Sequence, residues 1–232
     1  MKLVVFGCGG LGVPAAWTLA AAGAERLLLV DPDHVEASNL HRQVLYREAD
    51  LGRRKVDALA DALVARFPGL VVDRLAERMD AAGVRAALRG WDGAVEGTDD
   101  ATMKFHVSDA VVDARGDAAG PDAGARFACI AAAIGRRGQH FVVGPDTACY
   151  RCLFEAPPPP EAVASCRVAG VVGPVVGEVG ARAARSLWRA LHGRGEPARS
   201  ALLRLDHGRY HRTPVDVAGD CRCTAGSLVD GV

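Results

Sequence analysis

The sequence predicts an α/β protein built around a doubly wound, mainly parallel β-sheet, with a smaller C-terminal extension. Three observations lead to this prediction. Short apolar runs alternate along the chain with longer segments of helical periodicity. The first apolar run leads directly into a glycine-rich turn, and acidic residues follow the ends of later runs. Two close pairs of cysteines set the C-terminal part of the chain apart.

The first elements follow from apolar runs and helical spacing. KLVVF predicts a buried strand over residues 2–6, the Ala-rich segment 11–22 predicts a helix, and RLLLV predicts a second strand over 26–30. In segment 52–66, apolar residues recur at helical spacing and stop before Pro68, so a helix should end there. This opening is that of a Rossmann-like sheet.

The remaining elements are assigned by the same criteria. DGAVEG predicts a buried strand that ends beside two acidic residues, and the Gly- and Asp-rich stretch 115–126 predicts a loop. The other expected elements are a strand at 70–75, a short helix near 81–89, a strand at about 139–143 and a final helix at roughly 178–192.

Length and charge restrict the function classes. A chain of 232 residues can bury a sizeable core, and we expect one domain over 1–232, with a nucleotide-binding part at about 1–115 and a cysteine-containing C-terminal part at about 126–232. Basic and acidic residues both number 28, which gives no overall attraction to nucleic acid or an anionic membrane. Every apolar run stops well short of the ~18 residues of a membrane span. We therefore expect a cytoplasmic protein without membrane or direct nucleic-acid partners.

The loop GCGGLG at Gly7, Gly9, Gly10 and Gly12 indicates a phosphate site. Glycines allow the chain to turn tightly and bring backbone N–H groups close to a phosphate at a helix N-terminus. Asp31, nineteen residues after Gly12, is placed to accept a ribose hydroxyl. The loop alone does not distinguish NAD from ATP, since both carry a ribose and phosphates.

Two later segments favour a triphosphate. ASNLHRQ and GRRKV follow the second strand, where a triphosphate would extend, and they supply Arg42 and Lys55 as cations. Arg can bind two phosphate oxygens at once, Lys supplies a point charge, and Asn39 and Gln43 can hydrogen-bond ribose or phosphate. A redox dinucleotide does not require this set.

Asp99 and Asp100 complete the predicted polyphosphate site. They follow the strand in DGAVEG, and a carboxylate at a strand end beside a triphosphate suits Mg²⁺, which prefers oxygen ligands. We expect Asp99 to hold magnesium.

The cysteines point to a metal. Seven cysteines include the CxxC pair Cys149 and Cys152 and the CxC pair Cys221 and Cys223, which together can supply four thiolates to a tetrahedral zinc. The shorter CxC spacing leaves open the alternative that His211 or another group replaces one thiolate.

Taken together, GCGGLG, DPDHVEASNLHRQ, GRRKV, TDD and CYRCLFEAPPPPEAVASC resemble the MoeB/ThiF/HesA family of ubiquitin-activating-like adenylyltransferases, and especially the sulfur-carrier-activating branch. The resemblance covers most of the chain. It implies a nucleotidyltransferase that uses ATP and Mg²⁺ to join AMP to the C-terminal glycine of a ubiquitin-like sulfur carrier ending in Gly-Gly. It also implies a structural Zn²⁺ that ties the C-terminal extension to the body, a homodimer, and a separate sulfur donor, because the rhodanese-like extension of some relatives is absent.

The resemblance also assigns roles. Arg42 and Lys55 would contact the polyphosphate, Asp99 would hold magnesium, and Cys166 aligns with a cysteine that some relatives use to capture the activated glycine as a thioester or acyl disulfide. The implied catalytic residues are Arg42, Lys55, Asp99 and Cys166. The implied nucleotide-binding residues are Gly7, Gly9, Gly10, Gly12, Asp31, Asp33, Ser38, Asn39, Leu40, His41, Arg42, Gln43, Lys55, Asp99 and Asp100.

Some features depart from the family pattern. Asp100 stands where relatives usually have Asn, and Lys104 where they usually have Arg. The chain begins in the first strand, whereas relatives carry helices ahead of it. Three alternatives stay open: an enzyme of the same fold that adenylates a peptide or a tRNA base, an NAD-dependent oxidoreductase, and a non-catalytic carrier-binding scaffold.

Overall fold

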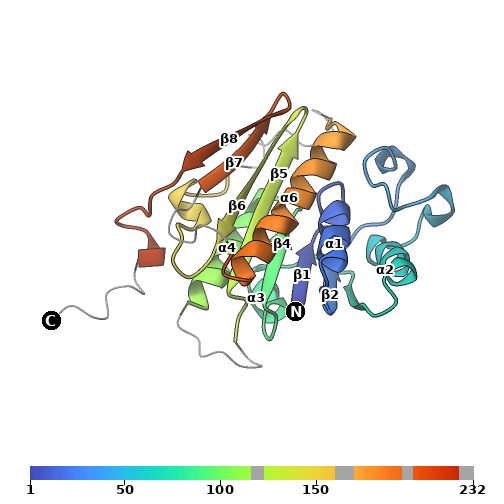
Figure 1. Cartoon of the computed structure of the whole chain (residues 1–232), viewed down its shortest axis with the longest axis horizontal. Helices are drawn as coiled ribbons and strands as arrows, with labels where there is room; N and C mark the ends of the chain where they lie inside the picture. The colour runs from blue at the N-terminus through green and yellow to red at the C-terminus, as the bar shows by residue number, and fades with distance from the viewer. Residues whose placement is uncertain (116–122, 160–169, 195–200, 225–232) are drawn as a thin grey trace.

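A computed structural model describes residues 1–115, 123–159, 170–194 and 201–224. One sheet joins its strands in the order β3-β2-β1-β4-β5-β6-β7-β8 (Figure 1). The strands are β1 (Lys2–Phe6), β2 (Arg26–Val30), β3 (Val71–Leu75), β4 (Gly93–Glu96), β5 (Phe127–Ile134), β6 (Arg137–Val143), β7 (Ala201–Asp206) and β8 (Arg209–Pro214). The α-helices are α1 (Gly12–Ala21), α2 (Lys55–Arg66), α3 (Ala81–Ala87), α4 (Ala101–Asp113) and α6 (Gly173–Leu191). Short 3-10 turns are η1 (Ala37–Asn39), η2 (Glu48–Asp50), η3 (Tyr150–Cys152) and η5 (Arg222–Thr224).

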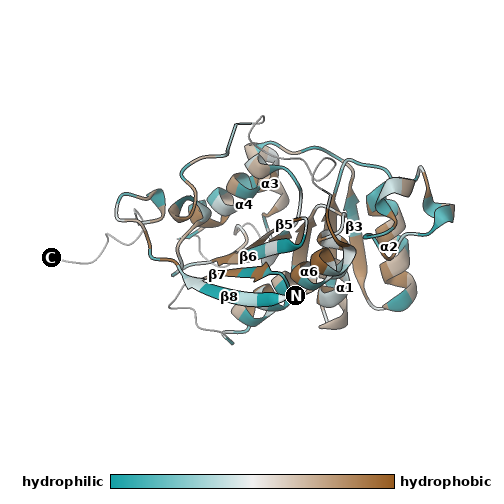
Figure 2. Ribbon diagram, turned by 90° about the horizontal axis from the view of Figure 1, so that it is seen from above, coloured by the Kyte–Doolittle hydropathy of each residue, from teal (hydrophilic) through white to brown (hydrophobic). Residues whose placement is uncertain are grey.

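Helices cover both faces of the sheet, as a doubly wound fold requires. Helices α1, α2 and α6 pack on one face and α3 and α4 on the other, each over its own buried cluster (Figure 1). Figure 2 shows hydrophobic residues where α1 and α6 meet the sheet and more hydrophilic residues along β8. A Cβ at Gly180 would lie 2.2 Å from the Leu11 carbonyl oxygen, so glycine at this position lets α6 approach α1 closely. Among the described helices, none is long and apolar enough to cross a membrane.

The sheet is mixed, whereas the sequence predicted a mainly parallel one. The pairs that join β3, β2, β1, β4 and β5 are parallel, as expected, whereas β5, β6, β7 and β8 pair antiparallel. Sequence periodicity missed β5, β7 and β8. Most of β8 is exposed at the sheet edge, so the strand lacks the apolar face that would reveal it.

Several boundaries also differ from the prediction. Strands β1 and β2 have the expected bounds, but α2 begins at Lys55 rather than at residue 52, after the turn at Gly52, whose φ is +80°. Helix α6 begins at Gly173, five residues early, with Pro174 in its first turn, where the missing N–H of proline costs no helical hydrogen bond. Helix α4 was not predicted.

A buried histidine links β6 to α6 and predicts acid sensitivity. His140 is 2% exposed, its Nε2 lies 3.1 Å from Ser186 Oγ, and its Nδ1 has no hydrogen-bond partner within the described structure. Burial, with a smaller contribution from Arg182, lowers the pKa of His140 to about 4. The folded protein therefore favours the neutral ring, whereas the unfolded chain binds a proton at an ordinary pKa of about 6.5.

We expect the stability that His140 contributes to be present above pH ~6.5 and to be lost as the pH falls towards ~4, by on the order of 2–3 kcal/mol. Urea titrations of the wild type and of His140→Gln at pH 7.5, 6.0 and 4.5 measure this. The difference between their unfolding free energies should shrink or reverse at acid pH, while a pH-independent difference would contradict the assignment. The comparison cancels the opposing effect of buried carboxyls such as Asp31 and Glu96, whose pKa values burial raises.

Candidate functional site

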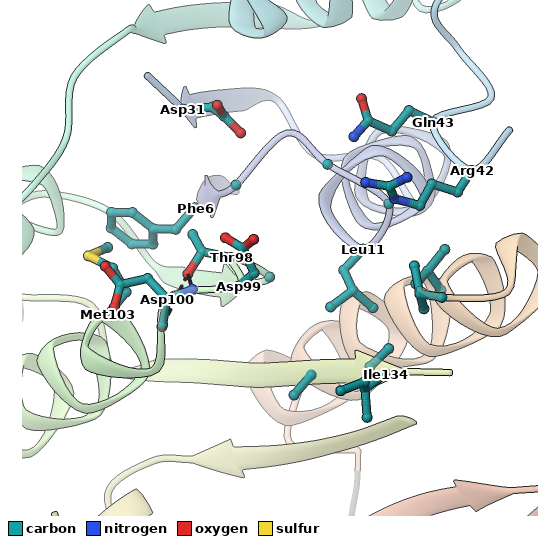
Figure 3. A pocket seen from close by; sticks show the side chains of 18 of the residues that line it. Phe6, Leu11, Asp31, Arg42, Gln43, Thr98, Asp99, Asp100, Met103 and Ile134 are labelled. Atoms are coloured by element: carbon teal, nitrogen blue, oxygen red, sulfur yellow. Dashed lines mark hydrogen bonds between the residues drawn. The ribbon is translucent and has the colours of Figure 1, made fainter. Parts of the chain in front are cut away.

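A cleft of about 1360 Å³ lies at the carboxyl ends of the parallel strands. The loops after β1, β2 and β4 line one part of it, and the β5–β6 turn and β7 line the other. In Figure 3, Asp31, Arg42 and Asp99 surround the same open space, with Ile134 at its far end. This is where ligands bind in sheets of this type.

The glycine loop after β1 accommodates only glycine at two of its positions. Gly7 has a φ of +87°, and a Cβ there would lie 3.0 Å from the Thr98 backbone nitrogen. A Cβ at Gly12 would lie 1.6 Å from the Gly7 carbonyl oxygen. Gly9 and Gly10 line the cleft, directly before α1, so the loop has the form expected of a phosphate-binding turn.

Asp31 holds this loop in place. Its Oδ2 accepts a 2.6 Å hydrogen bond from the Cys8 N–H and its Oδ1 accepts a 2.8 Å bond from the Asp33 N–H. Burial raises the pKa of Asp31 above its ordinary value, and the Lys55 charge and the two N–H groups oppose this shift. The carboxylate lines the cleft, and each oxygen keeps a second acceptor direction for a ligand hydroxyl.

The two predicted cations reach the cleft from different elements. Arg42 is half-buried after η1, where its Nη2 lies 2.5 Å from Asn39 Oδ1 and its Nη1 lies 3.3 Å from the Ser38 carbonyl oxygen. Lys55, at the first position of α2, is only 6% exposed; its Nζ lies 2.8 Å from Asp33 Oδ2 and 4.0 Å from Asp31 Oδ1. The structure thus places Lys55 beside the acidic end of β2, whereas Arg42 lies next to Gly10 of the glycine loop, where a Cβ would be 3.5 Å from its Cδ.

Gln43 lies beneath the glycine loop with an unused hydrogen-bonding group. The side chain is 2% exposed, and a Cβ at Gly9 would lie 3.6 Å from its Nε2. Its Oε1 is buried and lacks a partner among the described residues. The amide therefore lines the cleft with hydrogen-bonding capacity to spare.

The adjacent acids Asp99 and Asp100 differ in their contacts. Asp100 caps α4, since its Oδ1 accepts a 2.8 Å hydrogen bond from the Thr102 N–H. Asp99 is exposed, faces the cleft (Figure 3), and makes no hydrogen bond or ion pair with any described residue. The carboxylate that is free to bind a cation is therefore that of Asp99.

The other predicted nucleotide-binding residues do not all reach the cleft. Ser38 and His41 lie at its exposed rim, and Asp33 lines it beside Lys55. Leu40 packs against the hydrophobic core instead, and Gly12 is buried where the loop meets α1. Sequence reasoning also missed Glu96, which is fully buried next to the turn that carries Asp99. A lone acid in an otherwise apolar strand is the signal that could have identified this residue.

The four paired cysteines converge away from the cleft. Their Sγ atoms all lie within 4.8 Å of one another, with Cys149 3.4 Å from Cys221 and Cys152 3.5 Å from Cys223. Four thiolates at about 2.3 Å from a tetrahedral zinc are about 3.8 Å apart, so the cluster has the size of such a site. The CxC spacing brings both sulfurs into it.

Two other sequence hypotheses concern His211 and Cys166. His211 is not a member, because it lies on β8 and lines the cleft; the idea that it replaces a thiolate is wrong. Cys166, the predicted covalent catalyst, lies outside the described residues.

Comparison with known proteins gives a consistent result. A protein-family model described as the ThiF family matches residues 1–225. The chain is 39% identical over 205 residues to the sulfur carrier protein adenylyltransferase of Thermus thermophilus, which covers 88% of this chain and 74% of that one. It is 32% identical over 237 residues to the SAMP-activating enzyme E1 of Haloferax volcanii, which covers 100% of this chain and 83% of that one.

The bovine adenylyltransferase and sulfurtransferase MOCS3 is 39% identical over 225 residues, but the alignment covers 95% of this chain and only 45% of the bovine one. The chain thus spans less than half of that relative. Among solved structures, Escherichia coli MccB with MccA-N7isoASN aligns with a TM-score of 0.78 at 21% identity, covering 96% of this chain and 66% of MccB. This likeness shows the fold.

Proposed function

Since the chain belongs to the ThiF family, we propose that it transfers AMP from ATP to the C-terminal glycine of a ubiquitin-like sulfur-carrier protein. The observation that carries the proposal is one cleft that holds a glycine loop, two cations and an unpaired carboxylate at the ends of parallel strands. The relatives that match this chain are named as adenylyltransferases or as an E1 enzyme.

The cleft provides groups that suit the phosphates and the ribose of ATP. The glycine loop and the N-terminus of α1 suit phosphate, the Asp31 carboxylate suits a ribose hydroxyl, and the free amide oxygen of Gln43 suits a further hydroxyl or an ordered water. We assign Arg42 and Lys55 to the negative charge that develops as pyrophosphate leaves. Both are held by neighbouring acceptors before the ligand arrives, which reduces the cost of ordering them.

The reaction requires positioning and charge stabilisation more than proton transfer. A glycine carboxylate is already ionised at neutral pH, so its oxygen can attack the α-phosphorus without a general base. The bond from the α-phosphorus to the bridging oxygen breaks, and pyrophosphate leaves. The second half of the cleft, along the β5–β6 turn and β7, has room for the carrier C-terminus.

Two metal ions fit the residues present. The exposed Asp99 carboxylate has the oxygen donor that Mg²⁺ prefers, and magnesium bound there would neutralise charge on the triphosphate. Four thiolates at tetrahedral spacing suit Zn²⁺, which would tie η5 to η3. We further propose a single domain, a homodimer and a separate sulfur donor.

Exchange of labelled pyrophosphate into ATP tests the activity. With purified protein, Mg²⁺ and a carrier ending in Gly-Gly, we expect exchange that depends on the carrier. The same carrier without its last glycine is the matched control and should support none. A protein that binds nicotinamide coenzyme but not ATP, or that exchanges pyrophosphate equally with the truncated carrier, would contradict the proposal.

Cys166 gives a separate prediction about the step after adenylation. If its thiolate attacks the acyl-adenylate carbon and AMP leaves, Cys166→Ala should retain at least about half of the pyrophosphate exchange, because that exchange precedes the attack. The same variant, which has no nucleophile at this position, should lose the covalent protein–carrier adduct seen by non-reducing gel and intact mass. An adduct that survives in Cys166→Ala would show that another group captures the glycine.

A further inference from the structure

Glu96, the last residue of β4, is a carboxylate buried in the fold immediately before the Asp99 turn. Its side chain is 0% exposed. One oxygen, Oε1, accepts hydrogen bonds from both the Thr98 N–H at 2.8 Å and the Thr98 hydroxyl at 2.5 Å. Glu96 therefore holds the second residue of the turn through its backbone and its side chain.

Lys104, on the first turns of α4, completes the arrangement. Its Nζ lies 2.6 Å from Glu96 Oε2, 2.8 Å from the Thr98 carbonyl oxygen and 2.8 Å from the Ala131 carbonyl oxygen. An ammonium group has three hydrogens, and these three acceptors use all of them. Although Lys104 lines the cleft, it has no donor left for a ligand, so its role is to hold the protein.

The turn that Glu96 and Lys104 hold carries Asp99 and contacts the glycine loop. Thr98 precedes Asp99 directly, and its backbone nitrogen would lie 3.0 Å from a Cβ at Gly7 in the glycine loop. Gly97 lies close enough to the loop that a Cβ there would be 3.1 Å from the Leu11 Cβ. The turn after β4 is thus seated against the glycine loop on one side and anchored by a buried ion pair on the other.

We propose that Glu96 and Lys104 are positioning residues, which fix the turn at residues 97–100 so that the Asp99 carboxylate points into the cleft. Compared with well-packed neutral residues, a buried ion pair of this kind contributes little to the stability of the fold. Stability alone therefore does not account for the Glu96–Lys104 pair. Its hydrogen bonds, in contrast, fix the backbone at both sides of Thr98. One test, the Mg²⁺ dependence of pyrophosphate exchange, rests on the proposed adenylyl transfer. A second test, amide hydrogen exchange, does not.

The test replaces both charges at once, because removing only one would leave an unpaired buried charge. In Glu96→Gln/Lys104→Met, we expect a folded protein whose half-saturating Mg²⁺ concentration in pyrophosphate exchange rises about tenfold, the loss of roughly 1.4 kcal/mol of binding energy. The single variant Lys104→Arg keeps the charge and the donors, so its half-saturating Mg²⁺ concentration should stay close to that of the wild type. Val111→Ala is the matched control, since it creates a cavity under α4, lowers the melting temperature, and should leave the Mg²⁺ dependence unchanged.

A second readout measures the turn without any activity. Amide hydrogen exchange followed by mass spectrometry should show faster exchange of a peptide spanning residues 97–100 in the double variant, with little change in a peptide from α6. If the wild type fails to exchange pyrophosphate, the proposed function fails, and this measurement still decides the positioning role.

The outcomes that overturn the inference are specific. One is a double variant with unchanged Mg²⁺ dependence and unchanged exchange at 97–100. Another is a loss of the same size in Val111→Ala, which would reduce the effect to general stability. If the double variant does not fold, Thr98→Val keeps the ion pair and removes only the Thr98 hydroxyl; we then expect a two- to fivefold rise in half-saturating Mg²⁺, and no rise would contradict the proposal.

Discussion

Replacing Asp99 with Ala is expected to lower carrier-dependent pyrophosphate exchange by about 10²–10³-fold or more. Of the two acids after β4, Asp99 has no hydrogen bond or ion pair with a described residue, whereas Asp100 is engaged in capping α4. The change therefore removes a ligand-binding group and breaks no described hydrogen bond of that side chain. We expect little loss of stability to accompany the loss of rate.

The measurement is the initial rate of exchange over a range of Mg²⁺ concentrations, with the melting temperature recorded alongside. Asp99→Asn keeps the shape of the side chain and should be nearly as impaired, because an amide oxygen is a weaker ligand for a cation than a carboxylate. Asp146→Asn, an exposed acid in the turn after β6, is the matched control and should exchange at the wild-type rate. An Asp99→Ala protein with full exchange would show that the cation is held elsewhere.

Cys149→Ser should cause the second large effect, the loss of bound zinc and a fall in melting temperature on the order of 10 °C. Cys149 is buried, and its Sγ lies within 4 Å of the Sγ atoms of both Cys152 and Cys221. Without one thiolate, the metal that we propose to join η3 to η5 loses a quarter of its ligands. Residues 221–224 would then be held by hydrogen bonds and by the ion pairs of Arg222 with Asp109 and Asp113.

The effect should extend along α4 towards the cleft. Arg115, just beyond the end of this helix, donates hydrogen bonds to the carbonyl oxygens of Cys223 and Thr147. Arg151, inside the CxxC pair, binds both carboxylate oxygens of Asp109 on the same helix, at 2.9 and 2.8 Å. Because α4 begins beside Asp99, we expect pyrophosphate exchange to fall together with the metal content.

Metal analysis of the protein as purified, without added chelator, together with thermal unfolding, checks this prediction. Cys129→Ala is the matched control: it removes a buried thiol from β5, outside the cluster, and should retain one equivalent of zinc. A wild type that contains no zinc, or a Cys149→Ser protein that keeps a full equivalent, would exclude the proposed metal site.

The sequence predicted the parts of the fold whose signal is local. The runs at β1 and β2 are apolar because these are interior strands of the sheet with helices on both faces, so their bounds could be read directly. The glycine loop was equally clear, since its backbone excludes a Cβ at Gly12. The position of Asp31 and Asp99 at the carboxyl ends of parallel strands followed from topology alone.

Strand β8 shows why other parts could not be predicted. It lies at the edge of the sheet, and Tyr210, its least exposed residue, packs against Arg182 of α6, with the guanidinium carbon 3.9 Å from the ring centroid. The pairing partner, β7, supplies the hydrogen bonds that make it a strand. Because β8 is stabilised by its neighbours, its own residues show little apolar periodicity.

Residue types and spacing by themselves determined the parallel strands around the glycine loop, the candidate cations and acids, and the two cysteine pairs. Only the tertiary structure decided what each charged or sulfur-bearing group faces. It seats Lys55 against Asp33, distinguishes Asp99 from its capping neighbour, and brings Cys149 to Cys221 across 72 residues of chain. The reason is physical: backbone conformation depends on nearby residues, whereas the partner of a buried polar group depends on which distant elements pack around it.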